Sequence, residues 1–130
     1  MRDQKSITLF QESLAPASRT AAVNGTGVDV SGFDAATAVM QAGAAGGTSP
    51  SFTFQLQDSD DNSTFAAVAA ADLVGSQPAA VTAAQSPVRI GYIGKKRYLR
   101  WAITAVSGTS PTLLCSAGIL LGAPSKAPTA

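Results

Sequence analysis

Histidine is absent from the 130-residue chain, and cysteine occurs once, as Cys115. Without histidine the sequence lacks the usual general base, the commonest zinc ligand and any Ser-His or Cys-His nucleophile pair. A single cysteine cannot form a disulfide within the chain, which excludes a small secreted domain stapled by such bonds. The fold must therefore be held by packing, and we predict a non-enzymatic protein that needs no cofactor.

Charge and long apolar runs are also scarce. Charged residues make up 13% of the chain and hydrophobic residues 45%, which is too apolar for a disordered segment. The N-terminal apolar run covers only Ile7–Phe10, whereas a signal peptide needs roughly 7–15 apolar residues and a membrane span about 20. We expect a single domain, made in a cytoplasm and not bound to a membrane.

The charges are unevenly distributed, although the net charge is only +1. Residues 1–65 hold three Lys/Arg and seven Asp/Glu, and residues 66–130 hold six and one. Four of the later positive charges lie within 95–100, without the larger basic excess and interleaved aromatics of a nucleic-acid binder. We interpret this stretch as a solvated hairpin turn and expect no nucleic-acid partner.

Several segments alternate between apolar and polar residues, which is typical of half-buried β-strands. The clearest is Ser51–Gln57, with Phe52, Phe54 and Leu56 on one face. In Tyr98–Val106 the shared face holds Leu99, Trp101, Ile103 and Ala105, which makes Trp101 a predicted core residue. The last apolar run, Thr112–Leu121, is continuous, so we expect a strand that is buried on both faces or covered by a partner.

Small residues and proline divide the strands. The stretch Gly43–Pro50 predicts an irregular loop, and Ser107–Pro111 predicts a turn. We expect an all-β fold, an antiparallel β-sandwich or jelly-roll-like barrel, over residues 21–122. Residues 1–20 are expected to form an N-terminal arm with one short strand around Ser6–Phe10, and residues 123–130 a C-terminal tail.

The acidic segment 58–64 is the main candidate metal site. Its spacing resembles the start of an EF-hand loop, but Ser63 and Ala69 stand where that loop needs Gly and Glu. A looser oxygen site formed by Asp58, Asp60 and Asp61 stays open. We favour a plain turn in which these side chains bond their own backbone, with no metal.

Two segments resemble small proteins from the structural-gene regions of tailed bacteriophages and prophages. They are Phe52–Val68, which includes Gln57–Phe65, and Val88–Arg100, and Met1–Asp3 and Gly25–Phe33 fit the same group. The resemblance implies a virion accessory protein that decorates or cements the head, with the major capsid protein and other copies of itself as partners. Similar hairpins occur in tail proteins and in jelly-roll carbohydrate-binding modules. The alternative is therefore a carbohydrate- or host-surface-binding module of a tail or head fibre.

Each hypothesis predicts its own contact residues. A cement protein is expected to use its arm and the basic turn, and the candidates are Arg2, Lys5, Leu9, Phe10, Lys95, Lys96 and Arg97. A sugar-binding module needs exposed aromatic side chains, for which only Tyr92 and Tyr98 qualify, because Trp101 and the phenylalanines are placed on core faces. Cys115, inside the last apolar run, is expected to be a small buried residue.

Overall fold

The computed structural model describes residue 3 and residues 5–124, and it is built almost entirely of antiparallel strands. Helical structure in these residues is limited to one three-residue 3-10 turn, so none of their helices is long enough to cross a membrane. The elements are β1 (Thr8–Arg19), β2 (Val23–Asn24), β3 (Val28–Asp29), β4 (Phe33–Ser59), β5 (Ala66–Ala67), η1 (Ala70–Asp72), β6 (Leu73–Val74), β7 (Gln85–Tyr92) and β8 (Tyr98–Pro124).

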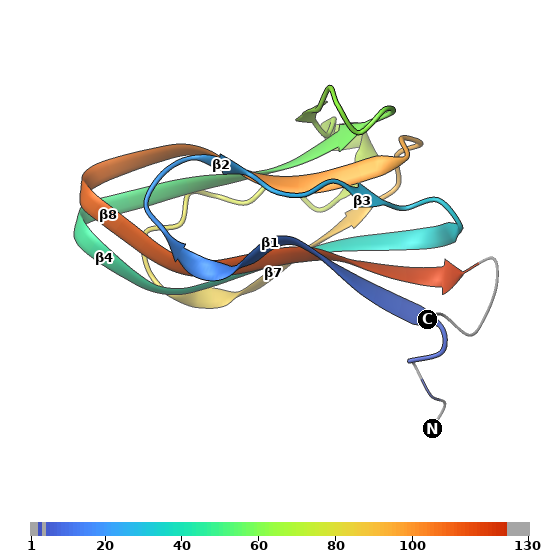
Figure 1. Ribbon diagram of the computed structural model, residues 1–130, viewed down its shortest axis with the longest axis horizontal. Coiled ribbons are helices and arrows are strands. Elements are labelled where there is room, and N and C mark those ends of the chain that lie inside the picture. The colour runs from blue at the N-terminus through green and yellow to red at the C-terminus, as the bar shows by residue number, and fades with distance from the viewer. Residues whose placement is uncertain (1–2, 4, 125–130) are drawn as a thin grey trace.

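Two long strands, β4 and β8, form the frame of the molecule. They pair from Phe33 opposite Pro124 to Ser59 opposite Tyr98, and both double back at the same end (Figure 1). Each strand therefore contributes to two layers that pack face to face. This architecture confirms the predicted all-β class.

The two layers differ in their edge strands. In the first layer, the early half of β4 and the late half of β8 lie between β7 and β1, and β6 extends the β7 edge. In the second layer, β2 and β3 pair with the early half of β8, and β5 pairs with the end of β4. The side-chain amide of Gln77 accepts a hydrogen bond from the backbone N–H of Leu56 and donates one to its carbonyl oxygen. It therefore covers part of the β4 edge.

The predicted loop at Gly43–Pro50 and the predicted turn at Ser107–Pro111 are both wrong. Strands β4 and β8 continue through these segments and bend within them. Their pairing shifts register repeatedly between Ala42 and Ser51. Gly47 and Gly108 adopt positive φ of 93° and 110°, and a Cβ on Gly47 would collide with the Ser110 carbonyl oxygen. Small residues thus bend a continuous ribbon where the sequence predicted a break.

Large side chains from both layers fill the core. Trp101 is completely buried, as predicted, and its ring meets Phe54 edge-on with centroids 6.4 Å apart. Its Nε1–H donates to the carbonyl oxygen of Gly118 in the other layer, at 3.1 Å. The predicted inner residues Phe52, Leu56, Leu99 and Ile103 are buried too. Ala105 is exposed instead, because a register shift between Thr53 and Phe54 turns it to the other face.

The N-terminal segment also differs from its prediction. From Thr8 to Arg19 it is an edge strand paired with β8 along nearly its full length, not an arm with a short strand around Ser6–Phe10. Leu14 is 2% exposed and belongs to the core. The expected boundary at residue 20 therefore cuts through the folded sheet. The expected tail 123–130 begins inside β8, and its residues 125–130 lie outside the described part.

Candidate functional site

The acidic turn after β4 does not gather its carboxylates around one point. Asp58 is buried and accepts a hydrogen bond from the Tyr92 hydroxyl at 3.0 Å, whereas Asp60 is exposed. Asp61 accepts the backbone N–H groups of Ser63 and Thr64, both at 3.0 Å, as an Asx turn does. These bonds lower the pKa of Asp61. Over residues 3 and 5–124, no three His, Cys, Asp or Glu side chains are placed to hold a metal ion together.

The prediction that Tyr92 is an exposed aromatic residue is wrong. It is 7% exposed, and its hydroxyl links two segments by donating to Asp58 and accepting the backbone N–H of Lys96 at 3.2 Å. Burial, reinforced by the nearby Asp58 carboxylate, raises the pKa of Tyr92 to about 12. Tyr92 therefore fixes the turn between β7 and β8.

In the basic turn, the three candidate cations have different environments. The Arg97 guanidinium forms a two-pronged ion pair with Asp29, with Nη2–Oδ2 at 2.8 Å and Nε–Oδ1 at 3.1 Å, and lies over the Tyr98 ring. This pair lowers the pKa of Asp29 and raises that of Arg97. Lys95 and Lys96 are exposed and form no side-chain ion pair within the described residues. Of the three candidate cations in the basic turn, Lys95 and Lys96 are therefore the two whose charge can meet a partner.

The candidate contact residues near the N-terminus also differ in their exposure. Lys5 is exposed and its backbone N–H donates to Asp3, whereas Leu9 is half-buried against the core. Phe10 is 56% exposed, which corrects its placement on a core face. Arg2 lies outside the described residues.

An exposed apolar surface escaped the sequence analysis. The outward side of the first layer, here called the outer face, carries Phe10, Val74, Leu114 and Leu120 with exposures of 56, 61, 52 and 37%. The inward side chains of the last strand, such as Leu113 and Ile119, are fully buried. The predicted strand is thus buried on one face, and on its other face Leu114 and Leu120 are exposed among the described residues. The continuity of the apolar run was the available signal.

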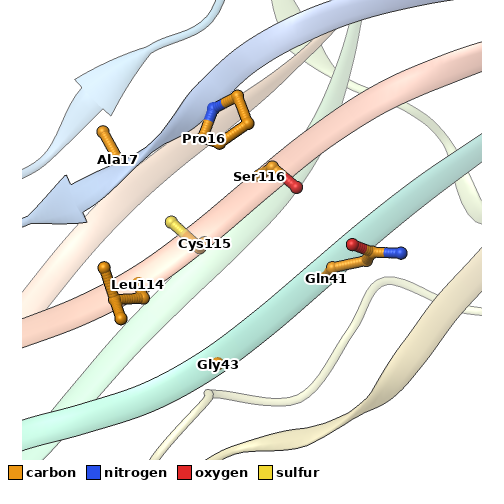
Figure 2. Close-up of a pocket in the computed structure, with 7 residues that line it drawn as sticks. All are labelled: Pro16, Ala17, Gln41, Gly43, Leu114, Cys115 and Ser116. Atoms are coloured by element: carbon orange, nitrogen blue, oxygen red, sulfur yellow. The ribbon is translucent and has the colours of Figure 1, made fainter.

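A shallow hollow lies beside this face, where β1 bulges away from β8. Its lining residues come from β1, β8 and β4, and Figure 2 labels them: Pro16, Ala17, Gln41, Gly43, Leu114, Cys115 and Ser116. The register between β1 and β8 shifts between Leu14 and Ala17, around Pro16, which has no N–H to pair. Cys115 is 6% exposed and burial raises its thiol pKa, so it is the buried residue that was predicted, with little thiolate at neutral pH.

Comparison of the chain with protein-family models, with curated proteins and with solved structures finds no match.

Proposed function

We propose that this chain is a structural virion protein of a tailed bacteriophage, which decorates the capsid exterior and cements the head by bridging capsid subunits. One observation carries the proposal. The end of the sandwich opposite the bend, here called the open end, presents Lys95 and Lys96 in a turn whose conformation is fixed from within.

The geometry of the open end supports this choice. Strand register places the start of β1 beside the end of β8, with Thr8 opposite Gly122, and the end of β4 beside the start of β8, with Ser59 opposite Tyr98. The turn between β7 and β8, orange in Figure 1, lies at the same end. Loops gathered at one end of a rigid scaffold are a common arrangement for binding.

The residues that resemble phage virion proteins fall at this end too. The Gln57–Phe65 segment forms the acidic turn, and Val88–Arg100 forms β7, the basic turn and the start of β8. Exposed lysines and carboxylates on adjacent turns suit a polar contact that is repeated over many capsid subunits, where multiplicity makes weak single contacts effective.

The aromatic side chains favour the capsid role over the carbohydrate-binding alternative. Sugar recognition by stacking needs an accessible aromatic ring, but Trp101 and Tyr92 are buried and Tyr98 is half-buried beside Arg97. Phe65 is half-buried too, with the Arg100 guanidinium 4.0 Å from its ring centroid. Phe10 is the exception, and its ring lies against Gly118 in a hollow that Val39, Gln41 and Ser116 also line.

The test is binding of the purified chain to heads that lack it, measured by co-sedimentation and by resistance of the heads to heat. We expect the chain to bind and to raise the temperature at which the heads release DNA. The double variant Lys95→Gln/Lys96→Gln is expected to bind at least tenfold more weakly at low ionic strength and to keep its melting temperature, because both side chains are exposed.

The matched control is Thr82→Asp/Thr109→Asp, which changes the net charge by the same amount at exposed positions away from the open end. It should bind heads like the unmodified chain. Failure of the unmodified chain to bind any head would refute the capsid role. Equal weakening by both double variants would refute the assignment of contact to the open end.

A further inference from the structure

The outer face has a regular arrangement because four strands cross it in a known register. One row runs from Phe10 in β1 through Leu120 and Thr37 to Gly91 in β7, and continues to Val74 in β6. Directly beside it, the next row runs from Glu12 through Gly118 and Val39 to Arg89. Alternate residues of a strand point to the same face, so both rows project outward together.

Opposite charges stand at the two edges of the second row. Glu12 in β1 and Arg89 in β7 are both exposed, and neither takes part in an ion pair within the described residues. Three strand spacings separate them, or about 14 Å, which is too far for a direct contact. Between them lie Gly118, against which the Phe10 ring packs, and the half-buried Val39.

We infer that the outer face binds a second copy of this chain, in a symmetric dimer whose two-fold axis runs parallel to the strands. Such an axis exchanges the β1 edge with the β7 edge. It therefore places Glu12 of each protomer against Arg89 of its partner and forms two equivalent ion pairs. Symmetric self-complementary interfaces of this kind are the commonest in homo-oligomers.

The charges select this orientation over the competing one. A two-fold axis perpendicular to the strands through the same row would set Glu12 against Glu12 and Arg89 against Arg89, and opposed like charges destabilise a contact. With the axis along the strands, the neighbouring row also matches. The exposed Phe10 then lies opposite the partner's Gly91, against which the partner's own Val74 side chain packs.

The size of the face is sufficient for a stable contact. Four strands about ten residues long cover roughly 600 Å² of sheet, near the approximately 800 Å² per partner of a standard interface. Sheets packed face to face cross at about 30°, a rotation that long Glu and Arg side chains accommodate. The inference does not depend on the capsid role, because it concerns the isolated chain.

Charge reversal tests the proposed dimer directly. Association of the full chain is measured by sedimentation velocity over a range of concentrations. The unmodified chain is expected to dimerise. Glu12→Arg alone and Arg89→Glu alone should each weaken the dimer at least tenfold at low ionic strength, because like charges then meet at both pairs. An equimolar mixture of the two single variants should recover dimerisation, since each heterodimer again holds two opposite-charge pairs.

The mixing experiment separates lost contact from lost folding, because a misfolded variant is not rescued by its counterpart. Lys95→Glu, which reverses a charge at the open end, is the control and should leave the dimer intact. A monomeric unmodified chain at high concentration overturns the proposal. An oligomer that is insensitive to both reversals also overturns it, and so does a mixture that associates no better than the single variants.

Discussion

The side-chain hydroxyl of Ser13 in β1 accepts the backbone N–H of Trp101 in β8 at 2.9 Å and donates to the carbonyl oxygen of Thr26 at 2.8 Å. This contact fills the gap between β2 and β3, where no strand among the described residues pairs with this edge of β8 at Trp101. Ser13 is 5% exposed. A segment expected to be a detachable arm therefore completes the hydrogen bonding of the central core residue.

Ser13→Ala should destabilise the protein by about 1–3 kcal/mol, because it leaves a buried N–H without an acceptor. Urea denaturation followed by circular dichroism measures the change. Ser18→Ala, at an exposed position of the same strand, is the control and should stay within about 0.5 kcal/mol of the unmodified chain. Equal stability of the two variants would show that water satisfies the Trp101 N–H.

Removal of residues 1–14 should lower the melting temperature strongly, since it removes half of an edge strand together with the buried Leu14. Leu14→Ala alone is expected to cost about 2–4 kcal/mol. Thermal unfolding of both variants tests this expectation. An unchanged melting temperature in the truncated chain would restore the arm hypothesis and separate β1 from the core.

The sequence predicted strands well where one alternation runs unbroken. Phe52, Phe54 and Leu56 follow this rule, and so do Leu99, Trp101 and Ile103. The alternation of Val88, Ile90 and Tyr92 also contained the signal that Tyr92 faces inward with Ile90. The prediction that Tyr92 is exposed is wrong because its ring follows this alternation into the core.

Prediction failed where the physical cause is not local. In β1 the register shifts twice between Glu12 and Ala17, so no two-residue period marks it as a strand. The glycine-rich bend is held by pairing between segments about sixty residues apart, which composition does not reveal. The outer face depends on which strands become neighbours, so Glu12 and Arg89 have no recognisable relationship in the sequence.

Trp101→Ala should destabilise the protein by roughly 3–5 kcal/mol, because its ring is fully buried between the layers. Trp101→Phe should cost less, since it keeps most of the packing and loses the bond to Gly118. The chain has one tryptophan, so its fluorescence should be blue-shifted in the folded state and move to longer wavelength on unfolding. Emission typical of a hydrated indole in the folded protein would contradict this burial.

The ion pair between Asp29 and Arg97 should make stability fall at acid pH. Because hydrogen bonds from Arg97 hold the pKa of Asp29 below its usual value of 3.8, the stabilisation is present above that value and is lost as the pH falls below it. Arg97→Gln should flatten this part of the pH–stability curve. Both side chains are about half exposed, so high salt should reduce the effect. A salt-independent curve would point to another carboxylate.

Tyr92 should control stability at alkaline pH. Its pKa of about 12 in the folded protein exceeds the usual value of 10.0, so folding favours the protonated phenol. The resulting stabilisation is fully present below about pH 10 and is lost progressively as the pH rises toward 12. Ionisation also removes the proton that Tyr92 donates to the buried Asp58, and two negative oxygens would then face each other. Urea denaturation at increasing pH measures the loss.

Two variants assign this alkaline transition to the pair formed by Tyr92 and Asp58. Tyr92→Phe should be less stable at neutral pH, because Asp58 loses its buried donor and the N–H of Lys96 loses its acceptor, and it should show a weaker alkaline decline. Tyr98→Phe is the matched control, because Tyr98 is half-buried and none of its bonds reaches Asp58. It should retain the full decline. If phenolate absorbance of the Tyr98→Phe variant shows Tyr92 ionising near pH 10, Tyr92 is not shielded by the core and the closed turn between β7 and β8 must open in solution.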